Sequence, residues 1–250
     1  MRTRYTAYMN GKGLQDIDPT IVITDIREKA PSMRNITSEK GWGHGSRFVA
    51  GFRESLAVGI RFMIREYDVN KRRDICSRIR AWAQEGYLTD SEHQGQRLYV
   101  VCTAFPNVDS AMKWTTELDL TLTAYDVPYW ENETPSKAST SGTSGTLALA
   151  MTGSTDAPLN LLVTTADTMT DFSITVNGAS MTFTGLNVTK LEITHDNRGI
   201  LSVKAGGASG LGKRTSASSD DLTVHYGANT LSYSCNTTCT VIATARGRYL

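Results

Sequence analysis

The chain has 250 residues, of which 40% are hydrophobic and 20% are charged, and its formal net charge is +1. This length suffices for one large or two ordinary domains with buried cores. The near-neutral balance excludes a globally basic nucleic-acid binder and an acidic disordered tail.

Apolar runs in the chain are short. The longest have about five residues, as at 147–151, against the ~20 needed to span a bilayer. The N-terminal residues lack the apolar segment of a secretory signal, and four cysteines are too few for a disulfide scaffold. We therefore expect a globular protein without a membrane span.

The composition changes sharply along the chain. Residues 1–135 carry 36 charged side chains and 19 Ser or Thr, whereas residues 136–250 carry 15 and 35. All four tryptophans lie before residue 135. The change predicts a first domain over 1–135 and a second over 146–250, joined at 136–145 by a polar Ser, Thr and Gly segment with the composition of a flexible linker. The apolar run at 146–151 leaves open that part of this segment joins a first strand.

Residues 1–135 combine strand patterns with one helical pattern. Alternating apolar residues predict antiparallel strands with one buried face. Residues 10–13 (Asn-Gly-Lys-Gly) form a turn signal between strands at 5–9 and 14–17, and 29–45 have no regular pattern. Further strands are expected at 21–26, 46–53, 56–67, 98–104 and 113–125. The order indicates an α+β domain, with a helix packed on an antiparallel sheet or barrel.

The helical pattern spans 68–86. Ile75, Ile79 and Trp82 recur at a spacing near 3.6 residues, so we expect Ile79 and Trp82 to anchor the helix in the core. Asp68 is a candidate N-cap, and Gly86 a candidate helix end.

Residues 136–250 have no helical period. Short apolar runs separated by turn residues, about 8–12 residues apart, are typical of a β-sandwich. Residues 177–178 (Asn-Gly) give the clearest hairpin signal. Strands are expected at 159–164, 172–176, 181–184, 190–195, 201–203, 222–224, 230–235 and 241–245.

The order of these elements is accompanied by several short sequence features. They are residues 41–45 (Gly-Trp-Gly-His-Gly), the basic and then amphipathic helix at 71–82, residues 126–129 (Asp-Val-Pro-Tyr), the segment 226–231 (Tyr-Gly-Ala-Asn-Thr-Leu) and the C-terminal 246–250 (Arg-Gly-Arg-Tyr-Leu). Over essentially the whole chain, this order resembles the distal tail protein of long-tailed, non-contractile bacteriophages, the siphophage tail component family.

The resemblance implies a specific organisation. The first domain would end at 126–129 and form a hexameric ring continuing the tail tube, and the second would be a galectin-like β-sandwich outside it. Implied partners are further copies of the chain, the tail tube protein, and tail tip, baseplate hub or tail fibre proteins. The implied location is the virion tail tip, after assembly in the bacterial host cytoplasm. The genome would cross the ring lumen without specific recognition.

The sequence lacks a recognisable catalytic constellation. Catalysis needs a nucleophile with a base, paired carboxylates or a metal cluster. The four histidines lack ligand spacing, and residues 41–45 lack the lysine of a phosphate loop. We therefore expect no enzyme and no catalytic, cofactor-binding or metal residues. The histidines are His44, His93, His195 and His225.

Two further features leave alternatives open. Cys235 and Cys239 either form a disulfide after release from a reducing cytoplasm or stay free thiols. The basic helix face is either salt-bridged to nearby acidic residues or a contact between ring subunits. Its cations are Lys71, Arg72, Arg73, Arg78 and Arg80.

The favoured hypothesis is a structural ring protein that joins the tail tube to the tail tip and adsorption apparatus. One alternative is a carbohydrate-binding module that aids host attachment, and another is a tail tube subunit. Sugar sites usually need exposed aromatic rings, yet no tryptophan follows residue 135, and Phe172 and Phe183 fit core positions. This favours a scaffold role for the second domain.

Overall fold

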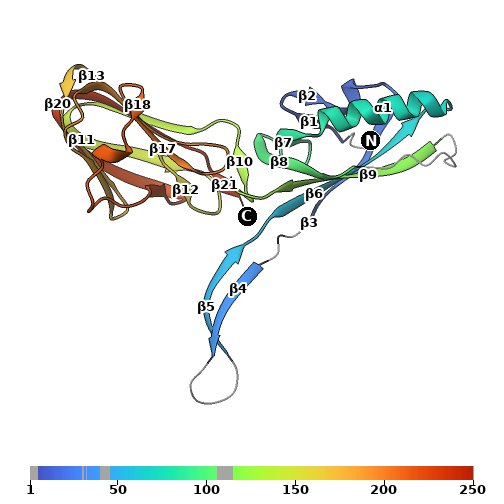
Figure 1. The fold of residues 1–250 in the computed structure, drawn as a ribbon, viewed down its shortest axis with the longest axis horizontal. Coiled ribbons are helices and arrows are strands. Elements are labelled where there is room, and N and C mark those ends of the chain that lie inside the picture. The colour runs from blue at the N-terminus through green and yellow to red at the C-terminus, as the bar shows by residue number, and fades with distance from the viewer. Residues whose placement is uncertain (1–4, 30, 32, 40–45, 106–114, 250) are drawn as a thin grey trace. The chain divides into compact units, whose positions relative to one another are not determined.

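A computed structural model describes residues 5–29, 31, 33–39, 46–105 and 115–249. The chain divides into two compact units, unit 1 (Met1–Trp130) and unit 2 (Glu131–Leu250), each visible in Figure 1. Among the described residues, no helix is long and apolar enough to cross a membrane.

Unit 1 is built mainly from antiparallel strands. Seven of them form a sheet in the order β2-β1-β7-β8-β9-β6-β3, while β4 and β5 form a separate two-stranded sheet. Its elements are β1 (Ala7–Met9), β2 (Lys12–Gly13), the 3-10 helix η1 (Leu14–Asp16), β3 (Ile21–Lys29), β4 (Met33–Glu39), β5 (Ser46–Arg53), β6 (Leu56–Arg65), α1 (Val69–Trp82), β7 (Glu85–Asp90), β8 (Gln96–Ala104), β9 (Thr115–Ala124) and the start of β10 (Trp130–Asn132).

Strand β6 is the centre of this sheet. It pairs with β9 along its length and with β3 on its other side. Its apolar residues alternate between buried and half-buried, so one face of the strand is in the core, as the sequence predicts. The buried members of β6 are Leu56, Val58, Ile60, Phe62 and Ile64.

Helix α1 lies along this sheet (Figure 1) and begins as predicted. The Asp68 carboxylate accepts the backbone N–H of Asn70 at 2.8 Å, which caps the helix. Ile75 and Ile79 are buried. Trp82 is only half-buried, and its indole N–H donates to the Lys12 carbonyl at 2.7 Å. The prediction that Trp82 is a core anchor was wrong, because the indole lies at the end of the helix and caps a turn instead.

The predicted helix end at Gly86 was also wrong, because α1 ends at Trp82 and Gly86 belongs to β7. Gly86 has φ +156°, and a Cβ there would lie 2.2 Å from the Asn10 side-chain nitrogen. Asn10 fills this space, accepting the N–H of Tyr87 and donating to the Glu85 carbonyl. Gly86 therefore admits a side chain from the β1–β2 turn.

Two other predictions for unit 1, at 14–17 and within 29–45, differ from the structure, although the turn before 14–17 is as predicted. The turn at Asn10 and Gly11 has positive φ at both residues, as predicted for a tight hairpin. After β2, Leu14–Asp16 form η1 rather than a strand at 14–17, and the Asp16 carboxylate accepts the Gly13 N–H. Within 29–45, expected to be irregular, Met33–Glu39 form β4 because they pair with β5.

Unit 2 contains β-strands and one 3-10 helix among its described residues. Its elements are β11 (Ser136–Met151), β12 (Ala157–Pro158), β13 (Asn160–Met169), β14 (Phe172–Val176), β15 (Ala179–Phe183), β16 (Val188–His195), β17 (Leu201–Ala205), β18 (Ala208–Ser209), η2 (Leu211–Lys213), β19 (Thr223–Val224), β20 (Gly227–Ala245) and β21 (Arg248–Tyr249). All eight sequence-predicted strands fall within these elements or overlap them.

The long strands β11 and β20 organise unit 2. The C-terminal half of β20 pairs with β13, and its N-terminal half pairs with β14. Strand β11 follows β20 through both halves, with an irregularity between Gly142 and Ser144. The pair thus contributes to two groups of strands, β13-β16-β17-β18 and β14-β15, around one apolar core.

The predicted linker at 136–145 was wrong. Residues 136–145 are the first ten residues of β11, paired with β20 from Ser136 onward. These residues are mostly exposed and half-buried in turn, as in an edge strand with one face to water, where Thr has good β-propensity and polar groups are solvated. Hydrogen bonding to the partner strand, invisible in the composition, orders the segment.

The hairpin predicted at Asn177 and Gly178 is confirmed. Both residues have positive φ, 49° and 82°, and they connect β14 to β15 in register. Phe172 and Phe183 face each other across this hairpin and are fully buried, as expected.

Truncation of Ile79 tests the packing of α1. Ile79 is fully buried, so Ile79→Ala should reduce the free energy of unfolding by about 2–5 kcal/mol through lost burial and a cavity. The exposed Arg73 on the same helix is the control, and Arg73→Ala should change stability by no more than about 0.5 kcal/mol. Urea unfolding followed by tryptophan fluorescence measures both, and equal small losses would contradict the packing.

Proline substitutions in β11 test whether 136–145 is a strand or a linker. Adjacent strand amides point alternately toward and away from the partner strand. Of Ser139→Pro and Thr140→Pro, one should therefore lose a hydrogen bond to β20, at a cost of about 1–3 kcal/mol. Chemical denaturation monitored by circular dichroism measures this loss. A flexible linker would tolerate both prolines.

Candidate functional site

The described histidines do not form a metal site. No group of three or more His, Cys, Asp or Glu able to hold a metal exists among the described residues, and His44 and residues 41–45 lie outside them. His93, His195 and His225 lie in separate surroundings, each beside a carboxylate.

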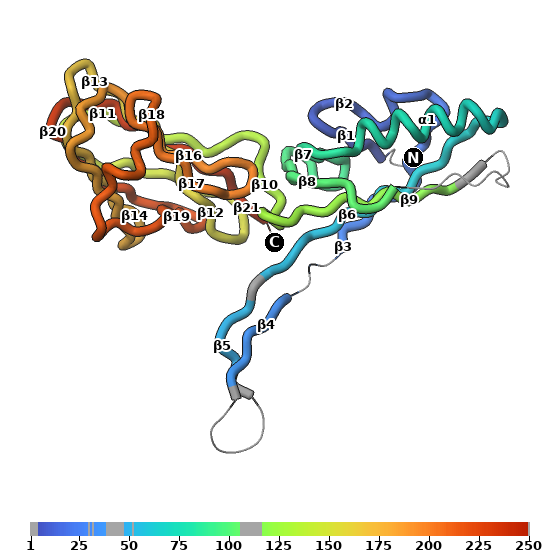
Figure 2. The backbone as a smooth tube through the Cα atoms, viewed as in Figure 1, coloured from blue at the N-terminus to red at the C-terminus, as the bar shows by residue number. Residues whose placement is uncertain are grey.

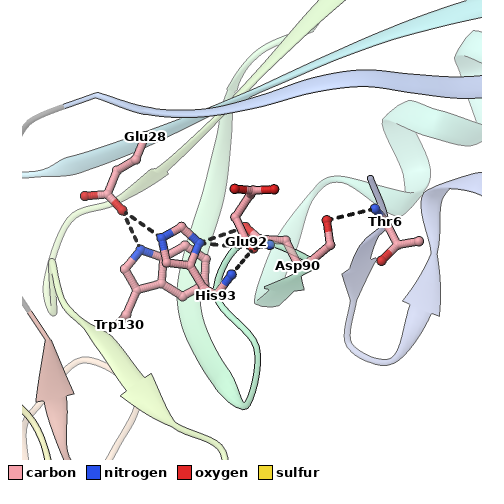
Figure 3. Close-up of polar contacts among 7 residues, drawn as sticks. Thr6, Glu28, Asp90, Glu92, His93 and Trp130 are labelled. Atoms are coloured by element: carbon pink, nitrogen blue, oxygen red, sulfur yellow. Dashed lines mark hydrogen bonds and ion pairs between the residues drawn. The ribbon is translucent and has the colours of Figure 1, made fainter. Parts of the chain in front are cut away.

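His93 belongs to a cluster at the C-terminal end of unit 1 (Figure 3). Its ring stacks on Trp130, the last residue of the unit, with centroids 3.8 Å apart and an interplanar angle of 11°. Its Nδ1 lies 3.0 Å from Asp90 Oδ1 and its Nε2 lies 3.3 Å from Glu28 Oε2. The Trp130 indole N–H donates to that same Glu28 oxygen at 2.8 Å.

The cluster favours a charged His93. Burial lowers the pKa of His93, but the hydrogen bond to Asp90 and the charges of Asp90, Glu28 and Glu92 raise it above its usual value overall. Both ring nitrogens face carboxylates, so the doubly protonated ring satisfies both. Asp90 is itself fixed, because it accepts the backbone N–H groups of Glu92 and His93. The cluster thereby holds Trp130 against β3 and the turn after β7.

His195 is also buried between polar partners. Its Nδ1 lies 3.0 Å from Asn160 Oδ1, and its Nε2 lies 2.8 Å from Asp221 Oδ1. The sequence neighbour Asp196 instead accepts the N–H groups of Arg198 and Ile200 in the following turn. His195 therefore ties β16 to the segment before β19, while Asp196 stabilises the turn that follows β16.

The basic face of α1 is partly neutralised. Arg78 pairs with Asp74 at 3.1 Å and with Asp18 at 3.2 Å, and it donates to the Ile17 carbonyl. A hydrogen bond from Thr20 is the main cause that lowers the pKa of Asp18, with Arg78 adding to it against the effect of burial. These contacts bear out the salt-bridged interpretation for Arg78, while Arg72 is buried.

Exposed apolar side chains of unit 1 gather on the two-stranded sheet of β4 and β5, called the arm below. Figures 1 and 2 show it continuing from β3 and β6 beyond the main sheet. Its apolar side chains are strongly exposed: Met33 by 58%, Ile36 by 43%, Phe48 by 61% and Val49 by 58%.

Both faces of the arm are apolar. Met33 and Ile36 are three positions apart in a regularly paired stretch of β4, so their side chains point to opposite faces. An isolated two-stranded sheet is at best marginally stable in water, and an apolar patch of this kind marks an interaction site. The sequence predicted β5 but missed β4, because the hydrogen bonds of β4 come only from β5.

Comparison with known proteins gives matches among solved structures. No protein-family model matches the chain, and no curated protein matches it. The chain has the fold of the Dit protein of phage SPP1. The TM-score is 0.73 at 12% sequence identity, and the alignment covers 98% of this chain and 99% of Dit. Dit of SPP1 is described as a paradigm of the hub adsorption apparatus in phages that infect Gram-positive bacteria.

Chains of the phage P2 baseplate in its activated conformation share the fold more distantly. One, from the baseplate with Ca, has a TM-score of 0.56 at 7% identity over 99% of this chain and 98% of its own. Another, from the baseplate with Sr, has a TM-score of 0.52 at 7% identity, over 97% of each chain. The resemblance to a phage distal tail protein is therefore confirmed for the fold over the whole chain.

The pH dependence of stability tests the His93 cluster. Because the folded-state pKa of His93 is raised, its contribution should be complete below about pH 6.5, the unfolded value. It should be lost as the pH rises through the higher folded-state value. His93→Gln should thus destabilise unit 1 most at pH 6 and least at pH 8.5, in urea unfolding read by tryptophan fluorescence.

The matched control is His225→Gln in unit 2, whose partner Asp156 is about half exposed. All tryptophans precede residue 135, so the fluorescence signal reports unit 1. A His93→Gln effect that stays constant between pH 6 and pH 8.5 would contradict a protonated His93.

Proposed function

We propose that this chain is a non-enzymatic structural protein of a phage tail. It acts as a distal tail hub, forming a hexameric ring that joins the tail tube to the tail tip or baseplate. It is then a virion component assembled in the host cytoplasm. The observation that carries the proposal is the match to SPP1 Dit over both units and nearly the full length of each chain.

The arm supports self-association of unit 1. A ring of identical subunits uses one surface to bind a different surface of the next copy. The arm carries apolar residues on two faces and has no other described element of unit 1 in its sheet. We assign a second copy of this chain as its occupant, because burial there would complete a sheet that is marginal alone.

Unit 2 is proposed as the outer, galectin-like domain, acting as a scaffold. Phe172, Phe183 and Tyr233 are buried in its core. Among the described residues of this unit, one large aromatic side chain is strongly exposed, that of Tyr226, by 67%. One exposed ring gives little material for stacking on sugars, so the scaffold role is preferred over a carbohydrate-binding module.

The arm variant Phe48→Ser/Val49→Ser tests this function. In the wild-type chain, light scattering at rising concentration should reach six times the 27.3 kDa chain mass, with rings in negative-stain images. The double variant removes two strongly exposed apolar side chains from the arm, so it should need at least tenfold higher concentration to associate, a change of about 1.4 kcal/mol.

Ile200→Ser is the matched control, since Ile200 is a similarly exposed apolar residue in unit 2, at 59%. It should associate like the wild type. Rings that form equally well in the arm variant would show that the interface lies elsewhere. An oligomer formed by residues 131–250 alone would place the association in unit 2, against the proposal.

A further inference from the structure

Strand β20 contains a pronounced bulge that carries two cysteines. Ser234 lies opposite Ser144 of β11, and Cys239 lies opposite Gly142. Five steps along β20 therefore match only two steps along β11. Residues 235–238 have no partner on β11, although Cys235 still pairs with Phe172 of β14, so two thiols that a regular strand would hold far apart are brought closer together.

The register of β20 against β11 limits the distance between the two cysteines. Two steps along β11 cover roughly 6.6 Å, and Ser234 and Cys239 are separated by a similar distance on the facing strand. Cys235 follows Ser234 directly. The backbones of Cys235 and Cys239 are thus closer than the roughly 13 Å that four steps of a regular strand would give, which brings them toward the span of about 4.4–6.8 Å that a disulfide bridges. A hydrogen bond and the charge of Cys235 help to raise the pKa of Cys239, so the two thiols influence each other.

The bulge is held in place by Asn236. Its side-chain oxygen accepts the backbone N–H groups of Thr170 and Asp171 at 2.8 and 3.1 Å. Its own N–H donates to the Asp171 carbonyl. The loop between the cysteines is therefore anchored to the turn between β13 and β14, and the two thiols are presented together without rearrangement of the strand.

The two thiols differ in access. Cys235 is half-buried and lines an open depression with Ser173, Thr182 and Asn236, where a small molecule can reach its sulfur. Cys239 is buried, and its thiol donates to the Gly142 carbonyl at 3.4 Å. Burial is the main cause that raises the pKa of Cys239 to about 12, and the charge of Cys235 adds to it. Cys235 is thus the entry point and Cys239 the second thiol.

We propose that Cys235 and Cys239 are an oxidisable pair that forms an intramolecular disulfide on exposure to a small disulfide oxidant such as glutathione disulfide. The Cys235 thiolate attacks one glutathione sulfur, and the first glutathione leaves as a thiolate that takes up a proton. Cys239 then loses its proton and attacks the Cys235 sulfur, which releases the second glutathione. Two protein thiols are oxidised and one glutathione disulfide is reduced to two thiols.

The bond would close the bulge where β20 changes from pairing with β14 to pairing with β13. A chain folded under reducing conditions carries two thiols there, and an oxidising exterior converts them to a covalent clamp. The disulfide would fix the point at which β20 passes from pairing with one group of strands of unit 2 to pairing with the other. It needs neither the ring nor any partner protein.

Peptide mass mapping of the full chain tests the pair. The native protein is incubated with glutathione disulfide, blocked with N-ethylmaleimide and digested with trypsin, which places both cysteines in the peptide 215–246. The expected result is a peptide about 2 Da lighter than the dithiol form and unreactive to the blocking reagent. Cys102, in the separate peptide 98–113, is the internal control and should not show this loss.

The variant Cys239→Ser separates the two chemical steps. Without the second thiol, Cys235 should keep a stable glutathione adduct of about 305 Da that the wild type resolves. A wild-type peptide that carries two maleimide groups after oxidation would overturn the proposal. So would a wild-type peptide that retains the glutathione adduct, since Cys239 would then be unable to reach Cys235.

Discussion

A two-stranded sheet cannot bury its own apolar side chains, and the arm of unit 1 is such a sheet. The core of unit 1 is built around β6, which pairs on both sides and places its alternate residues in the interior. The core of unit 2 is built around β11 and β20. Exposed apolar side chains gather on the arm, where Met33 and Ile36 point to opposite sides of one strand. An exposed apolar arm of this kind favours a function in association with another protein chain over one in catalysis.

Polar groups in both units serve mainly to connect strands. His93 joins Glu28, Asp90 and Trp130 at the end of unit 1, and His195 joins Asn160 and Asp221 within unit 2. In each case a histidine lies between acceptors supplied by distant parts of the sequence. Such networks contribute order and specificity to a sheet protein, and their arrangement matches a structural role better than a catalytic one.

Local signals in the sequence predicted the parts of the fold that local interactions determine. The alternation in β6, the Asp68 cap of α1 and the Asn177–Gly178 turn all follow from side-chain spacing or backbone preference. The misses depend on partners distant in sequence. The order of 136–145 comes from β20, β4 exists through β5, and Gly86 makes room for Asn10. The His93 cluster was missed because Glu28, His93 and Trp130 show no common spacing in the sequence.

Amide hydrogen exchange tests whether the arm is covered by a second copy of the chain. It is measured on monomeric and on assembled fractions of the full chain. The amides of Met33–Glu39 and Ser46–Arg53 are the reporters, and those of β6 give the reference within the same molecule. We expect the arm amides to exchange fast in the monomer, because the arm opens at almost no free-energy cost. In the ring, their exchange should be at least ~100-fold slower. Arm amides as protected in the monomer as in the ring, or equally unprotected in both, would contradict it.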